Sequence, residues 1–217
     1  MSDAPVAKDR YHHGNLRSAL LASALALIEE QGVGALTLRE VARRAGVTHA
    51  APYRHFADKS ALLAAVSAEG FRALVARSAK ETAGVADARR RFLRSGVAYV
   101  MFAVEHPAHF RVMFGPDRAA AADPLRCAAS DEAFGQLLDA IVACQKAGVV
   151  RRGDAMSIAV VAWAFVHGLA SLLVDEQLPP MPDVDGFVER SVRAFAEGIA
   201  PRSRPHARRE TSRSRRA

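Results

Sequence analysis

A glycine turn between two short helical segments constrains this chain more than any other feature. Residues 37–40, Thr-Leu-Arg-Glu, fit a capping box, in which the threonine hydroxyl and the glutamate carboxylate each accept a backbone N–H bond. Apolar residues follow at helical spacing, and Gly46 ends this helix about one turn later. Thr48 is the predicted N-cap of another short helix that ends near Phe56. This order is the layout of a helix-turn-helix unit.

The rest of the chain also reads as helical. Alanine is abundant, and it favours helices because it loses no side-chain entropy in them. Period-two alternation of β-branched residues is hard to find. Caps, glycines and prolines predict the bounds of further helices. One begins after Asn15, another after Asp58 and another at Asp154, and three more span about 88–105, 107–115 and 124–147. A last helix includes Phe187 to Ile199.

The expected fold class is all-α: an N-terminal three-helix, helix-turn-helix domain and a C-terminal helical domain. A chain of 217 residues suits one large or two small domains. We expect a disordered N-terminus over 1–10, the helix-turn-helix domain over 11–78, the C-terminal domain over 79–199 and a basic, disordered tail over 200–217. The boundary is placed where composition changes, from residue 79.

Positive charge gathers at the two ends of the chain. The net charge is +7, and the tail after residue 199 alone carries seven arginines against Glu210. The segment from Lys8 to Lys59 is mildly basic, whereas the long middle of the chain is close to neutral. This distribution suggests a polyanionic partner. A solvated tail that adds only non-specific attraction is the open alternative.

The stretch GVTHAAPYRHF, which begins at Gly46, has the composition of a DNA-reading helix. Small alanines allow close approach, while His49 and Arg54 can donate to base edges or phosphates, and the Tyr53 hydroxyl can donate to a phosphate. Pro52 is tolerated because it falls near the first helical turn. The predicted DNA-binding residues are Thr37, Arg39, Thr48, His49, Ala50, Ala51, Tyr53, Arg54, His55 and Lys59.

From Tyr11 to about Arg77 the chain resembles the N-terminal domain of the TetR/AcrR repressor family, through LTLREVARRAGVTHAAPYRHFADKSALL and the preceding ALIEEQG. The second half is similar to a C-terminal type of that family marked by W-x-x-x-H-G, here Trp163, His167 and Gly168, and by HPAHFRVMFG. Ser60 stands where the family commonly has glutamate, which weakens a capping box without touching a DNA-facing group.

The resemblance implies that 11–78 form the helix-turn-helix DNA-binding domain and 79–199 the C-terminal helical ligand-binding and dimerisation domain. It implies a homodimer joined by its last two helices, a palindromic double-stranded operator, and a repressor in the cytoplasm that an unknown small molecule releases from DNA. It also implies a cavity in the second half, whose candidate lining residues are Tyr99, Phe102, Phe110, Met113, Phe114, Trp163 and His167. The alternative is that these are ordinary core residues and that His167 is a satisfied buried imidazole.

The apolar run Ile158 to Val174 is the one segment that raises a membrane question. It is shorter than the roughly 20 residues of a spanning helix and contains His167 and Ser171, so a buried helix without membrane contact is expected. It is apolar on nearly every side, so a surface outside a small bundle must cover one face. A four-helix interface between two subunits would do so.

Other site chemistries find little support in the sequence. Neither a nucleophile–base set nor a glycine-rich phosphate loop is visible, so an enzyme is not expected. His106, His109 and His167 lack acidic or thiol partners at ligand spacing, so we expect neither metal nor cofactor. Cys127 and Cys144 are expected to be reduced, packed thiols. An architectural DNA-binding protein, an activator and a redox sensor remain open alternatives.

Overall fold

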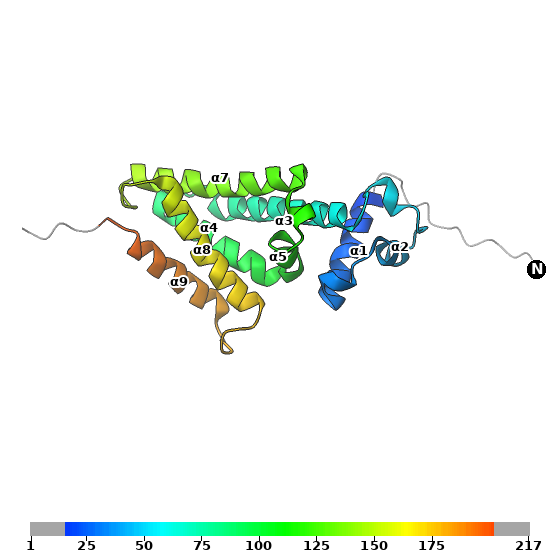
Figure 1. The fold of residues 1–217 in the computed structure, drawn as a ribbon. Coiled ribbons are helices and arrows are strands. Elements are labelled where there is room, and N and C mark those ends of the chain that lie inside the picture. The colour runs from blue at the N-terminus through cyan, green and yellow to red at the C-terminus, as the bar shows by residue number, and fades with distance from the viewer. Residues whose placement is uncertain (1–15, 202–217) are drawn as a thin grey trace, which may run out of the picture.

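The computed structural model describes residues 16–201, and this part of the chain is helical throughout, without strands (Figure 1). The all-α prediction is therefore confirmed. The elements are α1 (Leu16–Gln31), η1 (Val33–Ala35), α2 (Leu38–Arg44), η2 (Pro52–Arg54), α3 (Lys59–Thr82), α4 (Ala88–Glu105), α5 (Pro107–Met113), α6 (Arg118–Ala121), α7 (Pro124–Lys146), α8 (Ala155–Val174) and α9 (Val184–Gly198), η1 and η2 being single 3-10 turns. The predicted N-cap Asn15, the segment 1–10 and the tail from residue 202 lie outside the described residues.

Aspartate side chains cap the N-termini of α3, α7 and α8, as the sequence predicts. Asp123 accepts backbone N–H bonds at the start of α7, and Asp154 does so at the start of α8. Asp58 accepts from the backbone N–H of Ala61 at 2.8 Å and begins α3. These caps satisfy N–H groups that have no partner inside the helix, so the helix starts are fixed locally.

Helix α3 joins the two halves of the molecule. It is continuous from Lys59 to Thr82, so the boundary expected after residue 78 falls inside it. Lys, Glu and Ala residues in its last turns are good helix formers, which explains why the helix continues there. In Figure 1, α1 and α2 lie at one end of the molecule, α8 and α9 lie at the other, and α3 runs beside α7 between them.

Four clusters of buried residues form the core of the described part of the chain. The first joins α1, α2 and the start of α3 around Leu20, Val41 and Leu62, and it includes Ala120 of α6. The others pack α4 against α3, α5, α7, α8 and α9. Ala108 of α5 and Ala120 of α6 pack in the first core, whereas Phe110 and Met113 of α5 pack in the others, so the short α5–α6 segment connects the two halves.

The second short helix predicted from Thr48 to Phe56 is not a regular α-helix. The Ala51 N–H donates to the Thr48 carbonyl at 3.0 Å, and η2 then starts at Pro52, which has no N–H to continue an α-helical pattern. No side chain caps η2, so the capping role predicted for Thr48 is wrong in this structure. Pro52 therefore divides the segment into two tight turns.

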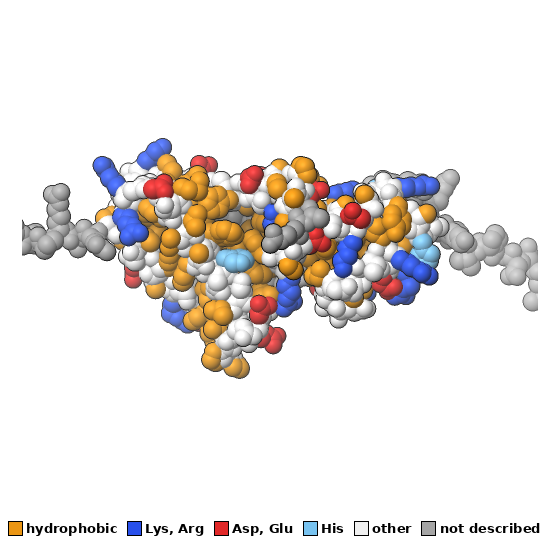
Figure 2. Space-filling model, viewed as in Figure 1, with side chains coloured by type: hydrophobic (Ala, Val, Ile, Leu, Met, Phe, Trp, Pro, Cys, Tyr) orange, Lys and Arg blue, Asp and Glu red, His pale blue; other side chains and the backbone are white. Residues whose placement is uncertain are grey.

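Helix α8 is long and apolar enough to cross a membrane by length and composition alone, with a mean hydropathy of 2.0 over its most apolar stretch. One such helix is weak evidence for a membrane span, because core and interface helices of soluble proteins have the same composition. In Figure 2, hydrophobic side chains gather on the face of the molecule where α8 lies.

Candidate nucleic-acid interface and apolar cavity

The segment from α2 to η2 turns its polar side chains outward at one end of the molecule. Its inner side is anchored by Val41 and Phe56, which are buried in the first core, and Pro52 is buried as well. Gly46 makes the turn with φ of 68°, in the left-handed region that glycine adopts without strain. The side chains left exposed include Thr37, Arg39, Thr48, His49, Ala50, Tyr53, Arg54 and His55, whereas Ala51 is half-buried.

This arrangement brings nine of the ten predicted DNA-binding residues into one short stretch of surface. Figure 2 shows Lys, Arg and His side chains at this end of the molecule. Arg39 and Arg54 form no ion pair with any residue that the structure describes, so their charges are available to an anion. A surface of exposed cations, hydroxyls and imidazoles suits phosphate and base-edge contacts.

Lys59 is the predicted residue that the structure directs elsewhere. Its Nζ donates to the backbone carbonyl of Val33 at 3.0 Å, and its side chain is half-buried. The amine therefore holds η1 against the start of α3 instead of projecting from the surface.

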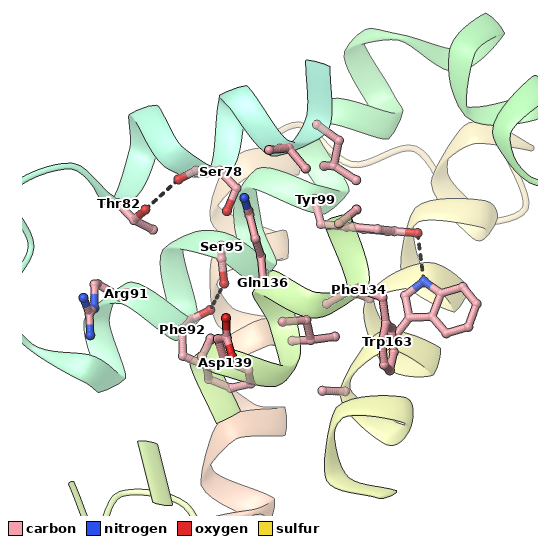
Figure 3. A pocket seen from close by; sticks show the side chains of 18 of the residues that line it. Ser78, Thr82, Arg91, Phe92, Ser95, Tyr99, Phe134, Gln136, Asp139 and Trp163 are labelled. Atoms are coloured by element: carbon pink, nitrogen blue, oxygen red, sulfur yellow. Dashed lines mark hydrogen bonds between the residues drawn. The ribbon is translucent and has the colours of Figure 1, made fainter. Parts of the chain in front are cut away.

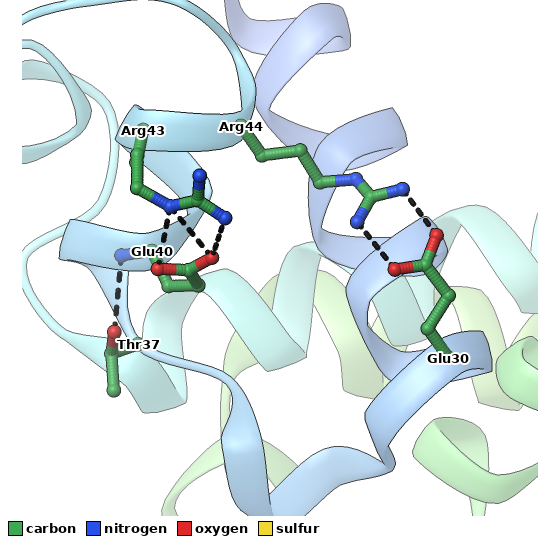
Figure 4. Close-up of polar contacts among 5 residues, drawn as sticks. All are labelled: Glu30, Thr37, Glu40, Arg43 and Arg44. Atoms are coloured by element: carbon green, nitrogen blue, oxygen red, sulfur yellow. Dashed lines mark hydrogen bonds and ion pairs between the residues drawn. The ribbon is translucent and has the colours of Figure 1, made fainter.

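The predicted capping box at residues 37–40 is half formed (Figure 4). The Thr37 hydroxyl accepts from the Glu40 N–H at 3.1 Å, as predicted. The second part of the prediction is wrong, because the Glu40 carboxylate accepts from the Arg43 guanidinium instead of the Thr37 N–H. This hydrogen bond lowers the pKa of Glu40.

Arg44 forms a second ion pair that sequence reasoning missed. Its guanidinium contacts both carboxylate oxygens of Glu30 and so ties α2 to α1 (Figure 4). The hydrogen bond with Arg44 lowers the pKa of Glu30. Both groups are exposed, so the pair orients α2 more than it stabilises the fold.

A cavity of about 680 Å³ lies in the second half, between α3, α4, α7, α8 and α9 (Figure 3). Its walls are mostly apolar and aromatic, and a few polar groups reach them. The apolar walls include Phe71, Leu74, Val75, Phe92, Phe134, Leu137, Val166 and Phe195. A space of this size, with apolar walls and few polar groups, is typical of small-molecule sites.

Three of the seven residues predicted to line a cavity do so: Tyr99, Phe114 and Trp163. The remaining four, Phe102, Phe110, Met113 and His167, are not among its lining residues. Phe102 and Met113 are 2% and 1% exposed and fill the core. For the phenylalanines and the methionine, the alternative of ordinary core residues therefore describes the structure.

His167 contributes to the cavity indirectly, through a hydrogen-bonded chain. The Trp163 Nε1–H donates to the Tyr99 hydroxyl at 3.3 Å, and that oxygen lies 3.0 Å from the His167 Nδ1 (Figure 3 shows the first contact). Because the hydroxyl accepts from Trp163, its own proton is free to be donated to Nδ1. Burial raises the pKa of Tyr99 and lowers the pKa of His167, so both groups are neutral near pH 7.

Sequence reasoning missed most polar groups at the cavity. Arg91 and Asp139 lie at the end opposite Trp163 in Figure 3, and Arg126 and Asp131 also line the space. They come from α4 and α7, with no shared motif. The usable signal was the spacing of Arg126, Ser130, Phe134 and Leu137 along one face of α7.

The cysteines and histidines show no site chemistry of their own. Between residues 16 and 201, no group of three or more His, Cys, Asp or Glu side chains could hold a metal ion. Cys127 and Cys144 are free thiols 17 residues apart on the same helix, so roughly 25 Å of helix separates them and they cannot bridge within one chain. Burial raises the pKa of Cys144.

Comparison with known proteins identifies both halves. A model of the tetR family of bacterial regulatory proteins matches residues 20–66, and one of the tetracyclin repressor-like C-terminal domain matches residues 92–195. No curated protein matches the chain.

Several solved structures are similar over most of the chain. A protein of unknown function from Rhodococcus sp. RHA1 is 38% identical, with a TM-score of 0.79, over 89% of this chain and 100% of that chain. A TetR-family transcriptional regulator from Rhodococcus sp. is 22% identical, with a TM-score of 0.69, over 87% of this chain and 100% of its own. The regulator PfmR from Thermus thermophilus is 24% identical, with a TM-score of 0.64, over 83% of this chain and 96% of its own.

Proposed function

Because the chain belongs to the TetR family of DNA-binding transcriptional regulators, we propose that it is a homodimeric repressor that a small-molecule ligand releases from a palindromic operator. One observation carries this proposal. Helix α3 begins next to the exposed segment from Thr48 to His55 and ends as a wall of the cavity. A rigid element shared by two sites can transmit a change at one to the other.

The domain organisation follows the same division. The DNA-binding domain covers 11–78 and the ligand-binding and dimerisation domain covers 79–199, with α3 shared across the boundary. The second domain is of the W-x-x-x-H-G type. In support of that assignment, Trp163 and His167 meet through the Tyr99 hydroxyl and are not independent surface residues.

On DNA, the exposed segment divides its work between backbone and bases. Tyr53 donates to a phosphate, while His49, Ala50 and Ala51 meet base edges in the major groove, and Arg54 serves either role. Thr37, Arg39, Thr48 and His55 add contacts around this centre. Lys59 would reach a phosphate only by releasing the Val33 carbonyl, so it is the weakest member of the predicted set.

The exposed face of α8 is the proposed dimer interface, together with α9. Met156, Val160, Val161 and Leu172 are each more than two-fifths exposed, and Val161, Ala164, Gly168 and Leu172 form an exposed apolar stripe along α8 at spacings of three or four residues. A helix with such an apolar stripe is expected to bury it against another surface. A second copy supplies the matching stripe under two-fold symmetry, which also matches a palindromic operator.

Sedimentation tests the interface directly. We expect Val161→Glu to convert the dimer to a monomer, because it places a charge within the apolar stripe, at its most exposed large side chain. Leu125→Glu is the matched control, because Leu125 is similarly exposed, at 42%, but lies on α7 outside the stripe. A dimer that survives Val161→Glu and dissociates with Leu125→Glu would place the interface elsewhere.

Release by a ligand requires a difference in affinity between two states of the dimer. In the DNA-binding state, the two reading segments stand about one DNA turn apart, roughly 34–36 Å. A molecule in the cavity that favours another spacing lowers operator affinity, by no more than its differential affinity for the two states.

DNA binding separates the repressor from its rivals. We expect gel shifts with DNA upstream of the chain's own gene to show much tighter binding than with random DNA of equal length. Equal affinity for both would favour an architectural protein with a steep salt dependence. Binding that changes with reductant would favour a redox sensor, and transcription that rises with the bound protein would favour an activator.

A further inference from the structure

Arg126 lies between the cavity and the DNA-binding half. It is half-buried near the start of α7 and lines both the large cavity and a second cavity of about 400 Å³. Val33 and Lys59 of the N-terminal half line that second cavity. The Cζ of Arg126 lies over the ring of Phe71, 5.5 Å from its centroid. One side chain therefore contacts the ligand space and the region that supports the DNA-binding segment.

The guanidinium of Arg126 fixes the ends of two short helices. Its Nη2 donates to the carbonyl of Met113, the last residue of α5, at 3.0 Å. Its Nη1 donates to the carbonyl of Ala121, the last residue of α6, at 3.2 Å. Carbonyls at helix ends have no partner inside the helix, so these two bonds hold α5 and α6 to α7.

The α5–α6 segment is in turn built into the DNA-binding half. The Ser60 hydroxyl of α3 donates to the Asp117 carboxylate at 3.1 Å, and that carboxylate also accepts from the Ala120 N–H. Ala120 is 7% exposed and packs in the core that anchors α1 and α2. A change at Arg126 therefore reaches the base of the DNA-binding segment through α6.

Arg126 has a charge that this part of the chain does not balance. No carboxylate of the described residues lies within ion-pair distance of it, and its partners are two neutral carbonyls. Asp131 and Asp139 also line the cavity, but both are exposed, where water screens them. A half-buried cation beside apolar walls attracts an anion more strongly than exposed groups do. An arginine also has five N–H donors, of which two are used here.

We propose that the large cavity binds a largely apolar molecule with one anionic group, and that this group binds the Arg126 guanidinium and draws it from the carbonyls of Met113 and Ala121. The proposal rests on the ligand-responsive function proposed above. Loss of the two bonds frees α5 and α6 from α7, and the contact of Ser60 with Asp117 transmits the change to α3. Operator affinity then falls.

Two dyes with one ring system test the charge preference. Anilinonaphthalene sulfonate is anionic, and phenylnaphthylamine is the same ring system without the sulfonate. Trp163 is the only tryptophan of the chain and lines the cavity, so energy transfer from it reports binding at this place. We expect the full-length protein to bind the anionic dye at least about tenfold more tightly than the neutral dye.

Variants assign the preference to one arginine. Arg126→Gln should weaken the anionic dye by about tenfold or more and leave the neutral dye unchanged. Arg91→Gln is the matched control and should change neither dye, because it removes an arginine that also lines the cavity but lies near Cys144, toward the other end of α7 from Arg126. The anionic dye should also weaken operator binding of the unmodified protein and have no such effect on Arg126→Gln.

Each contrary outcome is informative. Equal affinity for the two dyes, or binding of neither, overturns the anionic ligand using the unmodified protein alone, so a folding defect in a variant does not matter. Loss of the anionic dye in Arg91→Gln in place of Arg126→Gln overturns the assigned residue. None of these results touches the proposed repressor function, whose failure appears separately as equal affinity for operator and random DNA.

Discussion

Removing the hydroxyl of Tyr53 should weaken all DNA binding by the same factor. The side chain of Tyr53 is 60% exposed, and its hydroxyl makes no hydrogen bond to any residue that the structure describes. Tyr53→Phe deletes only this oxygen, so the free energy of unfolding should not change. Any effect on DNA affinity therefore belongs to the lost contact with DNA.

The size of the effect follows from a single charge-assisted hydrogen bond. A hydrogen bond to a charged group contributes about 1.5 kcal/mol or more, which is roughly a tenfold change in affinity for each subunit. In a homodimer both subunits lose the contact, so the operator affinity should fall by up to about a hundredfold. Phosphates carry no sequence information, so operator and random DNA should lose the same factor for each contact.

Fluorescence anisotropy with both duplexes at several salt concentrations provides the measurement. Tyr53 carries no charge and releases no counterion, so the slope of log affinity against log salt should stay unchanged in Tyr53→Phe. Arg54→Gln is the comparison, because each lost cationic phosphate contact reduces the magnitude of that slope by about 0.9, which is about 1.8 for the two subunits of a dimer. A loss confined to the operator would refute the phosphate contact and indicate that Tyr53 reads a base.

Three further predictions concern stability. Thr37→Ala removes the N-cap of α2 and should cost about 1 kcal/mol in urea denaturation, whereas Thr37→Ser should retain it. Burial lowers the pKa of His109 and His167, so below about pH 6.5 the unfolded chain binds more protons than the folded chain does. The free energy of unfolding should therefore be highest above that pH and should decrease as the pH falls. His109→Gln should reduce this decrease. An unchanged urea midpoint between about pH 7.5 and 5.5 would contradict this reasoning. Phe102→Ala should cost about 3–5 kcal/mol, with little change in dye binding, because this ring fills the core and does not line the cavity; a large loss of dye binding in a folded variant would oppose that assignment.

The helix starts and the helix-turn-helix layout could be read from the sequence because their causes are local. An aspartate at the N-cap, as at Asp58 or Asp154, satisfies N–H groups only two or three residues away. Gly46 adopts a backbone angle that other residues rarely adopt. The exposed polar residues of the DNA-binding segment followed from the same short-range pattern.

Pro52 shows where local reasoning stopped. The sequence indicated that a proline is tolerated near a helix start, and the expected helix was extended from Thr48 across it. The missing N–H of Pro52 instead starts a separate 3-10 turn. The Glu40 carboxylate shows the same competition, because Arg43, one turn later, is a stronger partner than a backbone N–H.

Only the tertiary structure decided which side chains face the cavity and which fill the core. Tyr99, Phe102 and Phe110 belong to neighbouring turns, and similar side chains were expected to share one role. The rotation of α4 and α5 against α3, α7 and α8 leaves Tyr99 at the cavity and turns the two phenylalanines into the core. The direction of Lys59 and the place of Arg126 between two cavities depend on the same packing. The sequence by itself determined where most helices begin and which segment leaves its polar side chains exposed, because those causes act within a few residues. The cavity arises from contacts between helices far apart in the chain, which no local pattern encodes.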